Sequence, residues 1–379
     1  MTIAKRFLTI IRDYFRYADS ILMLLCIAAS GFGLVMVYSA TRSYEGANGY
    51  MRIQILATAI GLVAFFVMSL VDIELVTDRW PLLLVFNIAF ICTLFIWGVE
   101  GDTGNRGWLR FAGAGIQPTE VVKITFALLL AKHICYLRDD SRIGMNSVVS
   151  VGSLLLHFGL MFGLIMAASS DLGSDLVFAF IFIVMLFLGG LKLRWLGIGV
   201  LMVGTSAPLV WSRFLTERQR ALIIAPYAPD VVDPTGLEIT WQAAQSRLAL
   251  ASGQITGRGL FKGPLSQSNT IPSKHTDFIF AVIGEELGLL GCLTVIVLLL
   301  AIIARCVYVG VKSGSRIKAL FCIGIAAMLA FQTFENIGMN VGLTPVIGLT
   351  LPFFSYGGSG TLSVLAAMGI VSGIRRTST

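Results

Sequence analysis

The sequence has few charged residues for its length. Only 13% of its 379 residues are Asp, Glu, Lys or Arg, whereas 56% are hydrophobic. This composition excludes a soluble enzyme built around one apolar core and indicates a polytopic membrane protein. The net charge of +7 would suit a nucleic-acid partner, but the basic residues fall in the loops between apolar runs, and we therefore expect no nucleic acid.

Signatures of disulfides and metal cages are also missing from the sequence. The six cysteines are scattered, mostly within apolar runs, and no two of them form a Cys-x-x-Cys pair. We interpret them as small packing residues. The three histidines, His133, His157 and His275, are too dispersed to indicate a metal cage.

Long apolar runs dominate the chain instead. About ten of them are long enough to cross a bilayer as helices, since a span needs about 20 residues. They lie near 20–40, 53–71, 81–99, 116–136, 148–168, 174–190, 194–211, 278–307, 317–340 and 356–374. The predicted fold class is therefore an all-α polytopic membrane protein, with residues 1–379 forming a single integral membrane domain.

The distribution of Lys and Arg predicts how these spans are oriented. Residues 1–18 are basic and amphipathic, which predicts an interfacial helix on the cytoplasmic face and not a cleavable signal. With the N-terminus inside, the short outer loops hold only four basic residues: Arg42, Arg52, Arg106 and Arg110. The positive-inside rule then places both termini in the cytoplasm.

One connection, residues 212–276 between spans seven and eight, is far longer than the others. It is external in this topology, and a loop of this length usually has a function. Trp241 to Leu250 predicts an amphipathic segment on the outer membrane surface.

At its end, this loop enters the eighth span through a polar stretch, Ile271 to Gly288. Asp277 stands where a helix N-cap is needed, and capping and a functional role are both open for it. Glu285 and Glu286 lie about two turns into the span, where acidic groups are costly unless they have a function or partners.

Three further polar clusters fall on the outer half of the predicted spans. Glu120 and Lys123 are spaced so that they can pair on one helical face. Asp171 lies in a tight turn, where it could instead serve as a helix cap. A polar stripe from Gln332 to Asn340 precedes a segment so rich in Pro and Gly that it predicts a re-entrant or broken backbone before the last span. Together the clusters predict a cavity open to the outside that would suit a phosphate-bearing lipid.

These motifs resemble the SEDS family (shape, elongation, division and sporulation), the RodA- and FtsW-like proteins, over nearly the whole chain. Four segments match the family in order. They are Gly104 to Lys123, Asp171-Leu172-Gly173, Gln245-Ser246 through His275-Thr276-Asp277, and Asn336 through Gly358. Ser273 replaces a usual Glu, and residues 226–241 depart from the common form.

The resemblance implies a peptidoglycan glycosyltransferase that polymerises lipid II on the outer face of the membrane. It implies Asp277 as the catalytic general base. It also implies a substrate-binding set comprising Arg106, Trp108, Glu120, Lys123, Asp171, Arg218, Arg220, Gln245, Ser246, Lys274, His275, Thr276, Glu285, Ser355, Gly357 and Gly358. Among these, the basic residues are candidates for pyrophosphate contact, and Glu285 could hold a divalent cation or a basic partner.

The same resemblance implies a location and partners. The chain would lie in the bacterial cytoplasmic membrane and bind lipid II, undecaprenyl-pyrophosphate-linked glycan and a class B penicillin-binding protein. No motif in the sequence identifies a cofactor, and binding of a divalent cation such as Mg or Mn is left as an open alternative. A lipid II flippase or transporter, and a non-catalytic scaffold of the wall-synthesis complex, are the alternative functions.

Overall fold

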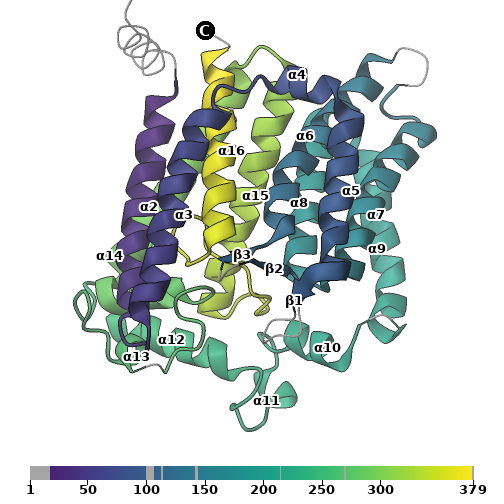
Figure 1. The fold of residues 1–379 in the computed structure, drawn as a ribbon. Coiled ribbons are helices and arrows are strands. Elements are labelled where there is room, and N and C mark those ends of the chain that lie inside the picture. Colours follow the sequence, from purple (N-terminus) through teal and green to yellow (C-terminus); the bar gives the residue numbers. More distant parts are fainter. Residues whose placement is uncertain are drawn as a thin grey trace, which may run out of the picture.

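The structure, a computed structural model, is a bundle of long helices (Figure 1). It describes residues 18–99, 106–111, 114–140, 144–213, 215–268 and 270–377. Each predicted span overlaps one long helix. These helices are α2 (Ser20–Thr41), α3 (Ala47–Met68), α5 (Trp80–Trp97), α6 (Pro118–Asp139), α7 (Val148–Ser169), α8 (Leu172–Gly189), α9 (Leu193–Arg213), α14 (Ile279–Lys312), α15 (Arg316–Val341) and α16 (Gly358–Arg376). The interfacial helix predicted for residues 1–18 falls, apart from its last residue, outside the described residues.

Two of these helices, α6 and α16, differ from the other eight in composition. Only the other eight are long and apolar enough to count as membrane spans by themselves. Most residues of α6 and α16 are buried by neighbouring helices. Because protein surrounds them, they need less apolar surface than a helix that faces lipid.

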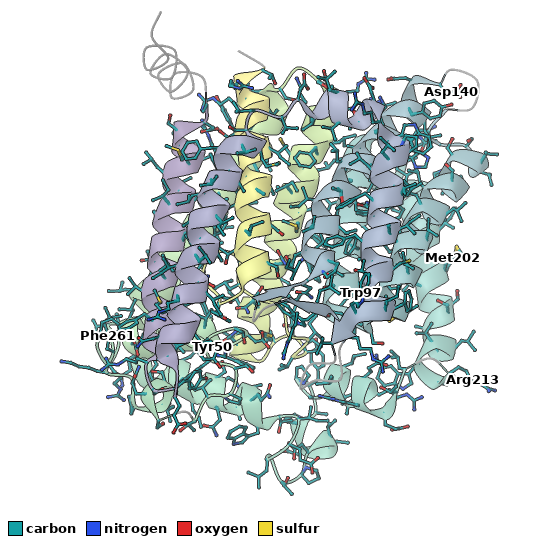
Figure 2. All side chains as sticks on the ribbon, viewed as in Figure 1. Tyr50, Trp97, Asp140, Met202, Arg213 and Phe261 are labelled. Atoms are coloured by element: carbon teal, nitrogen blue, oxygen red, sulfur yellow. The ribbon has the colours of Figure 1, made fainter. Side chains whose placement is uncertain are left out.

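Helix α9 is the opposite case, since none of its residues is buried. Figure 2 shows Met202 and Arg213 on this helix at the edge of the bundle. Exposure on all sides fits an apolar helix that is surrounded mainly by lipid.

The two ends of the described chain lie at the same end of the bundle (Figure 1). There, buried Asp19 caps α2 by accepting a hydrogen bond from the backbone N–H of Leu22 at 3.0 Å. Its carboxylate also pairs with Arg305 of α14 at 2.8 Å and Arg375 of α16 at 3.2 Å. One buried acid thus joins the ends of three helices.

The opposite end of the bundle, which we call the loop face, carries most of the short elements (Figure 1). A small antiparallel sheet, which the sequence did not predict, pairs Gly98 with Leu109 and Leu109 with Ile116. Its strands are β1 (Gly98–Val99), β2 (Trp108–Phe111) and β3 (Ala114–Ile116). Four short helices fold the long loop: α10 (Glu217–Ile224), α11 (Pro229–Val232), α12 (Trp241–Gly253) and α13 (Pro264–Gln267). Helix α12 lies where the amphipathic segment was predicted, and α4 (Ile73–Asp78) lies at the other end of the bundle.

The segment between α15 and α16, residues 342–357, contains neither helix nor strand, as its Pro and Gly content predicted. Leu351, Phe353 and Phe354 in it are nevertheless buried. A Cβ on Gly33 of α2 would lie 2.1 Å from the carbonyl oxygen of Phe353, so a glycine is needed at this contact. Protein surrounds this irregular backbone, which is the condition under which such backbone is tolerated at membrane depth.

Helix α14 is broken at Gly288, where φ is 68° and ψ is −165°. The backbone N–H groups of Leu289 and Leu290 lose their helical acceptors at the break. They donate instead to the carbonyls of Gln254 and Ile255, at 2.8 and 3.2 Å. The long loop therefore supplies the hydrogen bonds that the broken helix lacks.

Gly288→Ala is expected to lower the stability of the protein strongly. The backbone conformation of Gly288 is essentially restricted to glycine and would cost another residue about 1–3 kcal/mol. A Cβ would also lie 2.4 Å from the backbone nitrogen of Gly257. Gly163→Ala in α7 is the matched control, because its Cβ would meet nothing within 4 Å. Thermal unfolding in detergent should show a large loss for the first variant only, and equal midpoints would contradict the expectation.

Candidate active site

Asp277 lies in a tight turn immediately before α14. The carbonyl of Ser273 accepts hydrogen bonds from the backbone N–H groups of Thr276, Asp277 and Phe278, at 3.0, 3.1 and 3.3 Å. Phe278 is the N-cap residue of α14, and no side chain caps this helix. The capping hypothesis for Asp277 is therefore wrong, which leaves its carboxylate available for another role.

Two asparagines of α15 hold this turn from the other side. Asn336 and Asn340 donate side-chain hydrogen bonds to the carbonyl of Asp277, at 2.8 and 3.1 Å. The amide oxygen of Asn340 accepts from the backbone N–H of Ala281 at 3.0 Å and from the hydroxyl of Ser246 at 3.1 Å. This clamp joins α12, α14 and α15 at one point, so Asp277 is held by rigid elements.

The carboxylate of Asp277 is only partly exposed. Burial raises its pKa to about 6, a hydrogen bond from Thr276 opposes the shift, and the nearby negative charge of Asp171 adds to it. A Cβ on Gly348 would lie 3.7 Å from the carboxylate, so the irregular 342–357 backbone passes close to it. A group with this pKa is mainly ionised at pH 7 and still accepts a proton readily, as a general base must.

His275 lies in a cluster of three tyrosine rings. Its ring centroid is 5.4 Å from Tyr44, 5.2 Å from Tyr50 and 5.4 Å from Tyr356. Its carbonyl accepts the backbone N–H of Tyr356 at 2.7 Å. Burial, aided by the charge of Lys274, lowers the pKa of His275 to about 4, so the imidazole is neutral at pH 7. Sequence analysis missed Tyr44 and Tyr50, because no local pattern indicates that they meet His275.

Lys274 is fully buried, although we predicted that it contacts pyrophosphate. Its amine donates to the hydroxyl of Ser43 at 2.7 Å and to the carbonyl of Ser266. It also lies 4.7 Å from the ring centroid of Tyr44. Burial lowers its pKa to about 8, and the nearby Glu286 opposes the shift. This placement favours an anchoring role for Lys274 within the loop.

Glu285 and Glu286 are fully buried and bind the long loop. The carboxylate of Glu285 accepts the backbone N–H groups of Leu265 and Ser266, at 2.8 and 2.7 Å. Glu286 accepts the backbone N–H of Phe261 at 2.9 Å. Both oxygens of Glu285 thus accept loop N–H groups, and the divalent cation or basic partner suggested for this residue stays a hypothesis. No group of three or more His, Cys, Asp or Glu that could hold a metal occurs in the described part of the chain.

Glu120 and Lys123, in the first turns of α6, form the predicted ion pair. The amine of Lys123 lies 2.6 Å from Glu120, and both side chains are buried. Helix α6 starts at Pro118, which fits the first turn of a helix because it needs no N–H partner there. Glu120 also lines a small cavity with Gln332 and the irregular backbone near Gly357. The pair therefore forms part of a polar interior next to the irregular segment.

Asp171 caps α8, which confirms one of the two interpretations of its turn. Its carboxylate accepts the backbone N–H of Ser174 at 3.3 Å and the hydroxyl of the same residue at 2.7 Å. It also accepts a hydrogen bond from the side chain of Gln117 at 3.1 Å. Asp171 thereby joins the starts of α6 and α8, and its negative charge contributes to the raised pKa of Asp277.

The predicted Trp-containing loop forms the sheet of the loop face. The ring of Trp108 in β2 covers Gly115, where a Cβ would lie 3.0 Å from it. Arg106 is exposed, and its backbone N–H donates to the carbonyl of Ser169 at 3.2 Å. Both residues lie in the chain segment between α5 and α6.

The start of α16 is held to the turn before α14 by predicted site residues. The hydroxyl of Ser355 donates to the carbonyl of Thr276 at 2.6 Å. The backbone N–H of Gly357 donates to the side chain of Gln54 in α3 at 3.1 Å, and Gly358 begins the helix. The structure therefore places the conspicuous Ser-Tyr-Gly-Gly run directly against the Asp277 turn.

The remaining predicted residues lie in the long loop. Arg220 pairs with Glu217 at 3.0 Å within α10, and Arg218 lies on the same helix. Gln245 lies in α12 beside the buried Ser246, whose hydroxyl donates to the carbonyl of Asn340 at 2.9 Å. Ser246 therefore belongs to the Asp277 clamp, whereas the ion pair of Arg220 is local to its own helix.

Comparison with known proteins identifies relatives over nearly the full length of the chain. A family model for cell cycle proteins, named for FtsW, RodA and SpoVE, matches residues 20–379. The chain is 32% identical to a probable peptidoglycan glycosyltransferase FtsW of Trichlorobacter lovleyi, over 97% of this chain and 96% of the relative. It is 31% identical to the peptidoglycan glycosyltransferase MrdB of Escherichia coli K12, over 94% and 93%.

Solved structures share the fold. A chain from a study of polymerization and crosslinking by a peptidoglycan synthase complex superposes with a TM-score of 0.79 and 28% identity, covering 95% of this chain and 98% of that chain. The rod shape determining protein RodA of Thermus thermophilus superposes with a TM-score of 0.69 and 25% identity, covering 95% and 97%.

Proposed function

We propose that this protein, a member of the FtsW, RodA and SpoVE family of cell cycle proteins, polymerises lipid II with Asp277 as general base. Its membership of this family makes it a peptidoglycan glycosyltransferase. The observation that carries this assignment is the environment of Asp277. Its backbone is clamped by Asn336 and Asn340, and its pKa is raised to about 6. A positioned carboxylate with a pKa near the working pH is what removal of a hydroxyl proton requires.

In the proposed reaction, a sugar 4-hydroxyl attacks the anomeric carbon of a lipid-linked unit. Asp277 accepts the hydroxyl proton as the new C–O bond forms. The bond from the anomeric carbon to the pyrophosphate breaks, and undecaprenyl pyrophosphate leaves with the bonding electrons. Cations would stabilise its developing charge, and the exposed Arg106 and Arg218 are the candidates on the loop face.

We propose that the loop face points outward from the bacterial cytoplasmic membrane and that both termini are cytoplasmic. The bias of Lys and Arg supports this orientation. The proposed partner is a class B penicillin-binding protein whose membrane helix packs near α14 and α15. The exposed apolar side chains of α14, such as Leu289, Leu293 and Val297, offer a surface for it.

The direct test supplies purified protein and its penicillin-binding partner with labelled lipid II in detergent. The expected product is long glycan strands. Absence of polymer, with lipid movement across vesicles intact, would contradict the polymerase and support a flippase.

The pH dependence of the reaction is expected to follow Asp277. The base works in its ionised form, so kcat/KM should fall as the pH falls through about 6, approaching tenfold per unit below it. Polymerisation rates measured from pH 5 to pH 8 check this, with thermal unfolding recorded at each pH as the control for lost structure. A flat profile with intact protein would contradict the assignment.

A further inference from the structure

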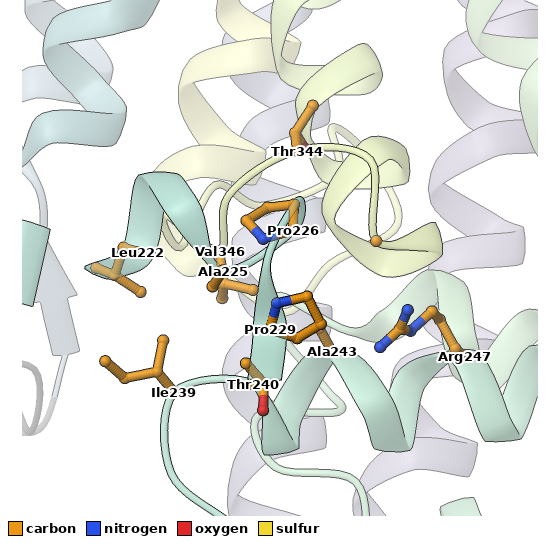
Figure 3. A pocket seen from close by; sticks show the side chains of 11 residues that line it. Leu222, Ala225, Pro226, Pro229, Ile239, Thr240, Ala243, Arg247, Thr344 and Val346 are labelled. Atoms are coloured by element: carbon orange, nitrogen blue, oxygen red, sulfur yellow. The ribbon is translucent and has the colours of Figure 1, made fainter. Parts of the chain in front are cut away.

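A second cavity lies on the loop face, outside the Asp277 turn (Figure 3). It is a shallow, partly open groove between α10, α11, α12 and the segment that follows α15. Apolar side chains form most of its wall, and Arg247 is the one charged side chain among the residues that line it. Among the lining residues are Leu222, Pro226, Pro229, Ile239 and Val346. We call this cavity the Arg247 groove.

Arg247 extends across the end of α15. A Cβ on Gly342, the C-cap of this helix with φ at 82°, would lie 3.1 Å from Cδ of Arg247, so glycine leaves room for the side chain. Figure 3 shows the guanidinium turned toward Ala243 and Pro229. Arg247 itself is exposed, and it forms no ion pair in the part of the chain that the structure describes. Its donors can therefore receive an anionic ligand.

The groove and the proposed base share one short segment of backbone. Thr344 and Val346 line the groove, and Gly348 passes beside the carboxylate of Asp277. Only Ile347 lies between Val346 and Gly348 in the chain, so their Cα atoms are at most about 7 Å apart. A molecule reacting at Asp277 could therefore extend a branch into the Arg247 groove.

We propose that the Arg247 groove binds the carboxylate-bearing peptide branch of the disaccharide–peptide unit during polymerisation. This inference rests on the proposed function. The guanidinium can hold a carboxylate with two parallel hydrogen bonds, and the apolar wall suits the aliphatic parts of a peptide. The groove is open along one side, so an extended branch can lie along it with its carboxylate at Arg247.

The competing role for Arg247 is structural, since a cation near the C-terminus of α15 stabilises the helix dipole. The two roles separate when the substrate is varied. A structural role affects every substrate equally, whereas recognition of the branch affects only substrates that carry it.

The test compares lipid II with the same lipid-linked disaccharide lacking its peptide. Arg247→Met should lower kcat/KM for lipid II by about 10- to 100-fold, which is the loss expected when a hydrogen bond to a charged group is removed. It should leave kcat/KM for the peptide-free substrate unchanged. Arg258→Met is the matched control, because this exposed arginine lies in the same loop but outside the groove, and it should leave both substrates unchanged. Ala243→Phe, which fills the groove while keeping Arg247, should reproduce the selective loss.

Equal losses on both substrates, or no loss on lipid II, would overturn the inference while leaving the polymerase in place. Failure of the proposed function would look different, since the wild-type protein would then polymerise neither substrate. Asp277→Asn, by contrast, should lose activity on both.

Discussion

Asp277→Asn is expected to abolish polymerisation and to leave the fold intact. The amide cannot accept the hydroxyl proton, and loss of a general base typically costs about 10²- to 10⁴-fold in rate. The fold should persist because Asn336 and Asn340 bind the backbone carbonyl of residue 277, not its side chain. Glycan strands made from labelled lipid II by equal amounts of inserted protein provide the measurement.

The control for this variant is Asp230→Asn, which removes an exposed carboxylate from the same long loop and should not change the rate. Normal glycan output from Asp277→Asn would refute the base assignment while leaving the reaction established. The search for the base would then move to Glu120, because its carboxylate borders the small cavity beside the irregular 342–357 segment.

Breaking the buried Glu120–Lys123 pair should have the next largest effect. Glu120→Gln or Lys123→Met leaves one charge buried without its partner, which typically costs about 3–5 kcal/mol. The double variant should recover part of this loss, since no uncompensated charge remains. Unfolding midpoints of the two single variants and the double variant, together with polymerisation rates, measure the coupling.

The matched control for this cycle is the exposed pair of Arg316 and Asp139, whose charged atoms lie 3.0 Å apart. An exposed pair is screened by solvent, so its cycle should give about 1 kcal/mol or less. Additive losses for Glu120→Gln and Lys123→Met would show that the two side chains do not stabilise each other.

Much of the architecture could be predicted from the sequence. Each predicted span overlaps a long helix, and eight of these ten helices are long and apolar enough to cross a membrane by themselves. This signal is strong because lipid tolerates only a few polar side chains. The Glu120–Lys123 pair was predictable as well, since residues three apart on a helix share a face. The irregular 342–357 segment was predictable from its dense Pro and Gly.

The capping of α14 was not predictable from local residues. Asp277 is a good cap in a suitable position, yet the turn built on Ser273 makes Phe278 the N-cap. Local propensity was overridden because Asn336 and Asn340, about 60 residues away in the chain, hold the backbone in that turn. Likewise, the break at Gly288 depends on Gln254 and Ile255, which replace the lost helical acceptors.

The sequence by itself therefore determined the class of protein, the spans, the family and the residue proposed as base. These depend on composition and on short motifs, which act within one helix or one turn. The tertiary structure alone decided which polar groups from distant parts of the chain share partners. It buried Lys274, satisfied Glu285 with loop N–H groups, gathered Tyr44 and Tyr50 around His275, and brought the Arg247 groove beside the Asp277 turn. Such contacts join segments far apart in the chain, and their geometry is set by how the helices pack against one another.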